Sequence, residues 1–280
     1  MKTISPVLLV IFDGFGLNPN RVFNGWAQAK TPHLDHYFAS FPHTALQASG
    51  RACGLPDGQF GNSEVGHLTL GSGRILLQDL QRISESLESG NFSKIPAWTK
   101  FLQGRTRLHL VGMVSDGGVH SHIDHLLGIL PLLVNAGIEP IVHMITDGRD
   151  TPPRSADGFA KTLEDQLQKL GKGRIATICG RYTAMDRAQY WERTQQAWQA
   201  LIEGKALSAP DSISAIHAAW KRGETDEFIQ PTIIGDPQQY RIQKEDAVFF
   251  FNFRSDRMRQ LAAAVRSEEH TSELQSLAYL

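Results

Sequence analysis

Leu108-His-Leu-Val-Gly-Met-Val114 is a mostly apolar run of strand length, and the segment after it, 123–136, has the pattern of a helix. This alternation continues along the chain. We predict further strands at 140–145, 174–179 and 247–251, and further helices at 155–170, 187–202, 212–222 and 256–265. Strands that alternate with helices form a largely parallel sheet with helices on both faces. The sequence therefore predicts a three-layer α/β fold.

Polar side chains follow these predicted strands, and ligands of open α/β sheets bind beyond the carboxyl ends of the strands. We therefore predict one crevice that contains Asp116, His120, Arg149, Asp150, Arg181, Arg187, Arg254 and Arg257. Guanidinium pairs bidentately with carboxylate and phosphate, so five arginines imply a ligand with more than one anionic group. The alternative is that some of these arginines form structural ion pairs with Asp147, Asp150, Asp186 or Asp256.

A serine lies in a second motif, Gly61-Asn-Ser-Glu-Val-Gly-His67. The two glycines allow the backbone to approach a ligand closely, and the N-terminus of a helix predicted over 64–70 attracts anions. Asn62 or Ser63 is expected to cap this helix. Ser63 is a candidate nucleophile, which needs a base or a metal to act. His67, four residues later, shares a helical face with Ser63; we favour a helix-packing role for it, with orientation of the serine as the alternative.

Two further patterns concern metal binding. The apolar run Val7-Leu-Leu-Val-Ile-Phe12 predicts a buried strand, and Asp13 at its end is a natural ligand for a hard metal, unless it is an ordinary turn residue. His120 and His122, with His125 nearby, could form a metal cluster. No second ligand pair of the usual spacing follows them. We therefore favour His120 as a substrate contact or proton donor, and structural roles for the other two.

The composition limits the classes of protein to which this chain can belong. The 280 residues contain 28 Lys and Arg against 29 Asp and Glu, so no overall basic bias favours nucleic acid. Cys53 and Cys179 are too few for a disulfide framework and fit a reducing cytosol. The run over 7–12 is too short for a signal peptide or a membrane span. We expect a cytoplasmic monomer that binds neither nucleic acid nor membrane.

Six motifs occur in a fixed order, and together they resemble the cofactor-independent (2,3-bisphosphoglycerate-independent) phosphoglycerate mutases of the alkaline phosphatase superfamily. The resemblance runs from about Val7 to about Val265. The motifs are Ile11-Phe-Asp-Gly-Phe-Gly16, Gly61–His67, Asp116-Gly-Gly-Val-His-Ser-His122, Asp147-Gly-Arg-Asp-Thr-Pro-Pro153, Gly180-Arg-Tyr-Thr-Ala-Met-Asp-Arg187 and Asn252-Phe-Arg-Ser-Asp-Arg257.

The resemblance implies an isomerase that interconverts 3-phosphoglycerate and 2-phosphoglycerate through a phosphoserine at Ser63. It implies two Mn²⁺ ions, for which Asp13 and Ser63 match family ligands. Asp150 is the candidate proton shuttle at the glycerate hydroxyls. The residues that match the family's substrate contacts are His120, Arg149, Asp150, Arg181, Arg187, Arg254 and Arg257.

The resemblance also implies a domain organisation. Residues 1–77 correspond to the first part of an alkaline-phosphatase-like domain, incomplete here, and 78–265 to a transferase-like α/β domain inserted into it. The family's later segment, which supplies further Asp and His metal ligands and a substrate lysine, has no counterpart after Arg257. Residues 266–280 instead read as the in-frame translation of a sequencing-library adapter, for which we expect a poorly packed short helix and no function.

Two other functions remain open on the sequence. Asp13 and Ser63 would also fit a metal-dependent phosphomonoester hydrolase, although a hydrolase has no need of five arginines to retain its product. The crevice alone would make the chain a non-catalytic binder of phosphorylated acids. Phosphate release separates the first of these from a mutase, and titration with 3-phosphoglycerate tests the second.

Overall fold

The structure, a computed structural model, describes residues 6–13, 15–61, 63–266 and 274–276. The chain divides into two compact units, Met1–Gln81 and Arg82–Leu280. Helix α4 (Asp79–Glu88) spans the division. The division lies a few residues after the boundary predicted at 77/78.

The second unit is built on one sheet, in the strand order β4-β5-β3-β2-β1-β6-β7. Strands β3, β2, β1 and β6 are parallel, as are the edge pairs β4–β5 and β6–β7, and only β5 runs antiparallel to its neighbour β3. The mostly parallel α/β fold is thus confirmed. The strand bounds are β1 (Arg107–Met113), β2 (Glu139–Thr146), β3 (Arg174–Gly180), β4 (Leu207–Ala209), β5 (Thr232–Ile234), β6 (Ala247–Phe250) and β7 (Leu274–Ser276).

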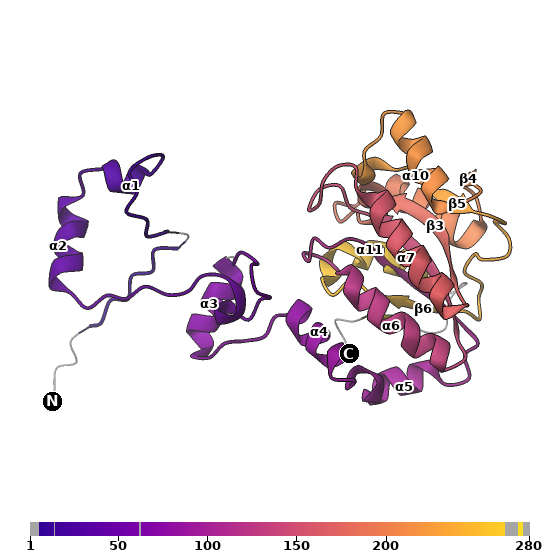
Figure 1. Ribbon diagram of the computed structural model, residues 1–280, viewed down its shortest axis with the longest axis horizontal. Coiled ribbons are helices and arrows are strands. Elements are labelled where there is room, and N and C mark those ends of the chain that lie inside the picture. Colours follow the sequence, from indigo (N-terminus) through magenta and orange to yellow (C-terminus); the bar gives the residue numbers. More distant parts are fainter. Residues whose placement is uncertain (1–5, 14, 62, 267–273, 277–280) are drawn as a thin grey trace. The chain divides into compact units, whose positions relative to one another are not determined.

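Helices cover both faces of this sheet (Figure 1). Side chains alternate along a strand, so Leu108 and Leu110 of β1 face one way, and Val111 and Met113 face the other. The second face packs against α9 (Trp191–Trp198), η3 (Gln199–Glu203) and α11 (Arg259–Val265) in one buried cluster. The first face carries α6 (Ile123–Asn135), α7 (Ala156–Leu170) and α10 (Ser212–Lys221), which contact β2 and β3. Burial on both faces explains why the central strands are almost continuously apolar.

The helices of this unit agree closely with the sequence-based prediction, except for the short elements near its start and between its strands. Their bounds are η2 (Phe92–Lys94), α5 (Pro96–Leu102), α6 (Ile123–Asn135), α7 (Ala156–Leu170), α8 (Arg181–Ala184), α9 (Trp191–Trp198), the π-helical turn η3 (Gln199–Glu203), α10 (Ser212–Lys221), η4 (Asp226–Phe228), η5 (Ser255–Arg257) and α11 (Arg259–Val265).

Two predicted helix starts are wrong. The helix predicted from residue 187 begins at Trp191, because the Asp186 carboxylate accepts hydrogen bonds from the amides of Ala188 and Tyr190 and Gln189 has a φ of 63°. These contacts hold 187–190 in a loop. The helix predicted from residue 256 begins only at Arg259, after the 3₁₀ turn η5. As a result, the predicted site residue Arg187 lies on a loop and Arg257 lies in the 3₁₀ turn, rather than on the predicted helices.

The first unit contains α1 (Gly25–Gln28), α2 (Pro32–Ser40), η1 (Gly50–Cys53) and α3 (Ser63–Ser72). Helix α3 confirms the helix predicted over 64–70, whereas the cap predicted at Asn62 lies outside the described residues. The strand predicted over 7–12 is wrong, since that segment has no regular structure and its side chains are exposed, from 95% at Val7 to 42% at Phe12. A buried strand needs hydrogen-bonded neighbours. Among the described residues of this unit, the single β-bridge joins Ser49 and Phe60.

The segment predicted to derive from an adapter is described only at Arg266 and 274–276. Leu274–Ser276 forms β7, parallel to β6 at the edge of the sheet, and is not helical. The segment forms a strand instead of the expected helix because the free edge of a sheet presents unpaired N–H and C=O groups, which can accept an extended segment of almost any sequence.

In the described ranges, the helices are all too short or too polar to cross a lipid bilayer. Cys53 and Cys179 are both buried free thiols.

Candidate functional site

Ser63, the predicted nucleophile, is the first residue of α3 and is exposed. His67 Nδ1 lies 3.2 Å from Ser63 Oγ and 2.8 Å from the Ser63 carbonyl oxygen. A carbonyl only accepts, so Nδ1 carries the proton in the shorter contact and cannot at the same time remove one from Ser63. His67 is exposed, so the predicted helix-packing role finds no support, and activation of Ser63 needs another group.

Asp13, the other predicted metal ligand, is exposed and follows the irregular segment 7–12. A hard divalent cation needs several oxygen or imidazole ligands. Within the described part of the chain, no group of three or more His, Cys, Asp or Glu side chains could hold a metal ion. Asp13 and Ser63 therefore do not amount to a metal site, and no catalytic step can be derived through a metal from these residues.

The predicted crevice lies in the second unit, and its most buried acceptor is Asp147, directly after β2. Asp147 Oδ1 accepts from the amides of Arg149 (3.2 Å) and Asp150 (3.0 Å), and Oδ2 accepts from Ser115 Oγ at 2.8 Å. Arg181 Nη1 lies 2.6 Å from Oδ1. Burial alone would raise the pKa of Asp147, but these hydrogen bonds outweigh it and the pKa is lowered. Asp147 thus stays ionised and fixes the loop that carries Arg149 and Asp150.

Arg181 joins the segments that carry three predicted site residues. It is buried at the end of β3, and its Nη1 also contacts Asp150 Oδ2 at 2.5 Å. Its Nη2 lies 2.9 Å from His120 Nε2. The structure therefore brings Arg181, Asp150 and His120 into direct contact, and two carboxylates balance the single buried guanidinium.

His120 is neutral in this arrangement. Burial and the neighbouring Arg181 lower its pKa to about 4. Arginine only donates, so Nε2 must accept from Arg181 and the proton must reside on Nδ1. His120 Nδ1 is buried and has no hydrogen-bond partner among the residues that the structure describes. A neutral imidazole with an unpaired N–H is suited to donate to an anionic oxygen, which supports a substrate contact over a role as a charged proton donor.

Arg187 and Arg254 meet at one carboxylate that the prediction treated only as a possible ion-pair partner. Asp256 Oδ2 accepts from Arg187 Nη1 at 2.7 Å, and its Oδ1 accepts from Arg254 Nε at 3.0 Å. The amide of Arg254 also donates to the His120 carbonyl oxygen at 3.4 Å. This last contact connects the Arg187–Arg254 pair to the His120 loop.

Arg257 and Arg149 are the remaining two of the five arginines predicted for the crevice. Burial, followed by repulsion from Arg187 and Arg181, lowers the pKa of Arg257, and its Nε is buried without a hydrogen-bond partner. Arg149 is more exposed and lies 3.7 Å from Glu227. The repulsion that Arg257 receives from Arg187, Arg181 and Arg149 indicates that these arginines are neighbours, while a crevice formed by all five stays a prediction. Most are also held by carboxylates, so the ion-pair alternative applies to them as well.

Some functional-site residues were missed or misplaced by sequence reasoning. Ser115, Asp147 and Glu227 contribute contacts to the site, and of these Ser115 and Asp147 could have been indicated by their positions after predicted strands. Asp116 was expected in the crevice but is exposed, and no described hydrogen bond joins it to the network. His122 and His125 are structural, as predicted: His122 accepts from the amide of Asp124 at the start of α6, and His125 contacts Ser84.

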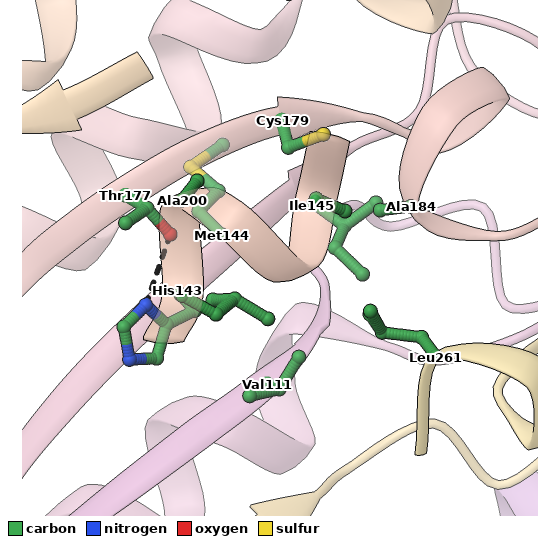
Figure 2. Close-up of a pocket in the computed structure, with 11 residues that line it drawn as sticks. Val111, His143, Met144, Ile145, Thr177, Cys179, Ala184, Ala200 and Leu261 are labelled. Carbon is green, nitrogen blue, oxygen red and sulfur yellow. Dashed lines mark hydrogen bonds between the residues drawn. The ribbon is translucent and has the colours of Figure 1, made fainter. Parts of the chain in front are cut away.

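Two cavities of the described part of the chain lie away from this site. A cavity of about 10 Å³ lies between β1–β3 and the α9–η3–α11 layer, next to His143 and Thr177 (Figure 2). That volume suits about one water molecule and excludes a phosphorylated acid. A wider surface depression between α5 and the end of α6 contains none of the predicted site residues. The candidate site is therefore the group of Arg149, Arg181, Arg187, Arg254 and Arg257 around His120, which we call the arginine cluster.

Comparison with known proteins places the chain in a family. The family model described as "BPG-independent PGAM N-terminus" matches residues 83–279, which includes most of the segment 266–280. A 2,3-bisphosphoglycerate-independent phosphoglycerate mutase of Syntrophotalea carbinolica is 46% identical over 269 residues, covering 94% of this chain and 52% of the relative. The protein of that name in Symbiobacterium thermophilum is 48% identical over 265 residues, covering 93% and 51%.

A search of solved structures also finds a phosphoglycerate mutase. The phosphoglycerate mutase of Leishmania mexicana, studied in crystals at low cobalt concentration, superposes with a TM-score of 0.73 at 31% identity, covering 89% of this chain and 50% of that one. The chain spans about half the length of the relatives that it matches. It belongs to the family of 2,3-bisphosphoglycerate-independent phosphoglycerate mutases.

Proposed function

We propose that this chain carries the nucleophile and the substrate crevice of an enzyme that interconverts 3-phosphoglycerate and 2-phosphoglycerate. The observation that supports it most is the arginine cluster around neutral His120. A phosphoglycerate has a phosphate and a carboxylate, and the cluster offers guanidinium groups from three separate loops together with one unpaired imidazole N–H. Such an arrangement suits two anionic groups on one small molecule.

The reaction proposed has two balanced transfers. Ser63 Oγ attacks phosphorus, the bond from phosphorus to the substrate's 3-oxygen breaks, and the proton released by Ser63 is balanced by the one gained at that oxygen. In the second transfer, the 2-hydroxyl attacks the phosphoserine and Ser63 is regenerated. Asp150 is the group proposed to move protons at the two glycerate hydroxyls.

Retention of the intermediate explains why several cations are needed. Between the two transfers, glycerate carries only its carboxylate and must rotate without leaving. Arg187, Arg254 and Arg257 are proposed to hold that carboxylate, with His120 donating from Nδ1, so that water does not replace the 2-hydroxyl. A simple phosphomonoester hydrolase gains nothing from this retention, which favours the mutase.

For the metal we propose two Mn²⁺ ions, which would supply Lewis-acid polarisation of phosphoryl oxygens and would lower the pKa of the serine hydroxyl. Asp13 and Ser63 are the ligands that this chain offers, and the described residues do not complete the set. We further propose that the enzyme acts in the cytoplasm as a monomer, on small molecules and without nucleic acid or membrane.

Isothermal titration of the 280-residue chain with 3-phosphoglycerate tests the crevice. Replacing Arg187→Ala should weaken binding at least tenfold, since truncating one partner of a charge pair costs roughly 2–5 kcal/mol. Arg174→Ala is the matched control, because Arg174 lies at the opposite end of β3 and stacks on Tyr240. Equal affinities for all three proteins, or no binding by the wild type, would reject the crevice.

Ser63→Ala tests the nucleophile separately. This variant should bind 3-phosphoglycerate like the wild type, because Ser63 is not part of the arginine cluster. In the complete enzyme it should abolish turnover, and a wild-type rate would exclude a phosphoserine. Release of inorganic phosphate at the rate of 3-phosphoglycerate consumption would instead identify the hydrolase.

A further inference from the structure

Asp256 holds two arginines from segments that are far apart in the sequence. Arg187 belongs to the loop before α9, whereas Arg254 precedes the turn η5. Each side chain is about half exposed, at 50% and 49%, while the Asp256 side chain is 31% exposed. Two long side chains at a solvated surface would otherwise sample many rotamers, and each would lose that freedom on binding a ligand.

The geometry of the two contacts leaves the arginines able to bind something else. Arg187 uses Nη1 and Arg254 uses Nε, each against a different oxygen of Asp256. In the described part of the chain, neither guanidinium makes another side-chain hydrogen bond. Arg187 keeps Nε and Nη2, and Arg254 keeps both Nη groups, so each guanidinium retains an edge for a ligand oxygen.

Asp256 lies among three cations. The nearby Arg254 and the hydrogen bond from Arg187 keep its pKa below the usual value despite burial. Arg257, in the same turn, is repelled by Arg187 and attracted by Asp256. One carboxylate therefore screens three cations that would repel one another in its absence.

We propose that Asp256 is a positioning residue that fixes Arg187 and Arg254 for a ligand with two anionic groups. This inference rests on the proposed function for the identity of that ligand, but not for the ordering of the arginines. Asp256 does not contact the reacting atoms in this proposal. It sets the spacing and direction of two guanidinium groups, and so selects a phosphate joined to a carboxylate over a single small anion.

Two simple ideas predict opposite effects of Asp256→Asn. If Asp256 only lowers the positive charge of the crevice, removing it should tighten binding of every anion. If it positions Arg187 and Arg254, affinity for 3-phosphoglycerate should fall about tenfold, while affinity for inorganic phosphate, which needs no fixed spacing, should stay or rise. Titration calorimetry with both ligands measures the ratio of the two affinities.

Two further variants control this measurement. Asp256→Glu keeps the carboxylate and should recover part of the lost selectivity. Asp165→Asn removes the same charge from an exposed site on α7 and should leave both affinities unchanged. Thermal unfolding of each variant shows whether it is folded, and the selectivity ratio of a folded variant is not changed by a loss of stability alone.

A ligand-free measurement keeps this test separate from that of the proposed function. In ¹⁵N NMR spectra, the Arg254 Nε–H should exchange slowly with water in the wild type and in Asp165→Asn, and quickly in Asp256→Asn. Equal exchange in all three would overturn the positioning role, as would unchanged or tighter binding of 3-phosphoglycerate by Asp256→Asn. If the wild type fails to bind 3-phosphoglycerate, the proposed function fails, and the exchange rates alone decide the role of Asp256.

Discussion

Asp147 shows how one side chain can organise a site without being part of a recognised pattern of catalytic groups. Its carboxylate receives hydrogen bonds from two amides, a hydroxyl and the guanidinium of Arg181, and it is only 1% exposed. A buried charge is stable only when it is paired and hydrogen-bonded. The same contacts that stabilise Asp147 therefore determine where Arg149, Asp150 and Arg181 lie.

The isosteric change Asp147→Asn should lower the free energy of unfolding by about 3 kcal/mol, because it breaks a buried pair and leaves Arg181 with Asp150 as its single carboxylate partner. Urea unfolding at pH 7 measures the difference. Asp165→Asn, on the exposed surface of α7, should change it by less than about 0.5 kcal/mol. A loss at Asp147 no larger than that of the control would contradict the role assigned to this carboxylate.

At the scale of elements, the turn η4 (Asp226–Phe228) positions two of the site loops. Asp226 Oδ2 accepts from the amides of Ser155 and Ala156 and so caps α7 from a distant part of the chain. The backbone of η4 also passes very close to Gly148 and Gly180, which precede Arg149 and Arg181. The two arginine loops can take their places only because both positions lack a Cβ.

Gly148→Ala tests this contact. A Cβ at Gly148 would lie 2.7 Å from the Glu227 amide nitrogen, and the residue has a φ of +71°, so the loop must shift. We expect a loss of more than about 2 kcal/mol in unfolding free energy and weaker binding of 3-phosphoglycerate. Calorimetry and urea unfolding measure both quantities.

Gly158→Ala is the matched control within the same unit. Gly158 lies inside α7, where an added methyl group would have nothing within 4 Å, and alanine favours a helix over glycine by about 1 kcal/mol. This variant should therefore be slightly more stable and should bind normally. Equal behaviour of the two variants would show that η4 does not constrain the Arg149 loop.

At the scale of the whole second unit, a chain of hydrogen bonds crosses three strands. His109 Nε2 lies 3.1 Å from Asp246 Oδ2, His109 Nδ1 lies 2.8 Å from His143 Nε2, and His143 Nδ1 lies 2.9 Å from Thr177 Oγ1. Figure 2 shows the last of these contacts beside the small cavity. With both imidazoles neutral, every donor meets an acceptor in one direction, from Thr177 to Asp246.

This arrangement predicts that acid destabilises the protein. Burial lowers the pKa of His109 and of His143 below the usual 6.5. Below that pH the imidazoles of the unfolded chain take up protons that the folded protein does not bind, so stability is full above about pH 6.5 and is lost as the pH falls. The two histidines together should reduce the unfolding free energy by up to about 2 kcal/mol between about pH 6.5 and 5.5.

Urea unfolding over this pH range measures the slope. His143→Gln should have a smaller slope, because one neutral imidazole is removed from the buried chain, even if its stability at pH 7 is lower. A wild-type slope in His143→Gln would show that the acid sensitivity arises elsewhere.

Much of the second unit is determined by its sequence alone. Apolar runs such as Leu108–Val114 and the amphipathic helices between them can be recognised because sheet and helix periodicity depend only on local geometry. The ordered motifs were sufficient for the family, whereas the crevice inferred from the arginines that follow the strands stays a prediction. The roles of Ser63 and Asp150, and the origin of residues 266–280, stay predictions.

Only the tertiary structure decided how those residues are used. The pairing of Arg187 and Arg254 on Asp256, the capping of α7 by Asp226 and the tautomer of His120 depend on side chains that folding brings together from distant segments. The apolar run over 7–12 shows the limit of local pattern, since it has the composition of a buried strand and no neighbouring strand among the described residues of its unit. Periodicity is a property of one segment, whereas pairing, burial and charge compensation are properties of several segments in contact.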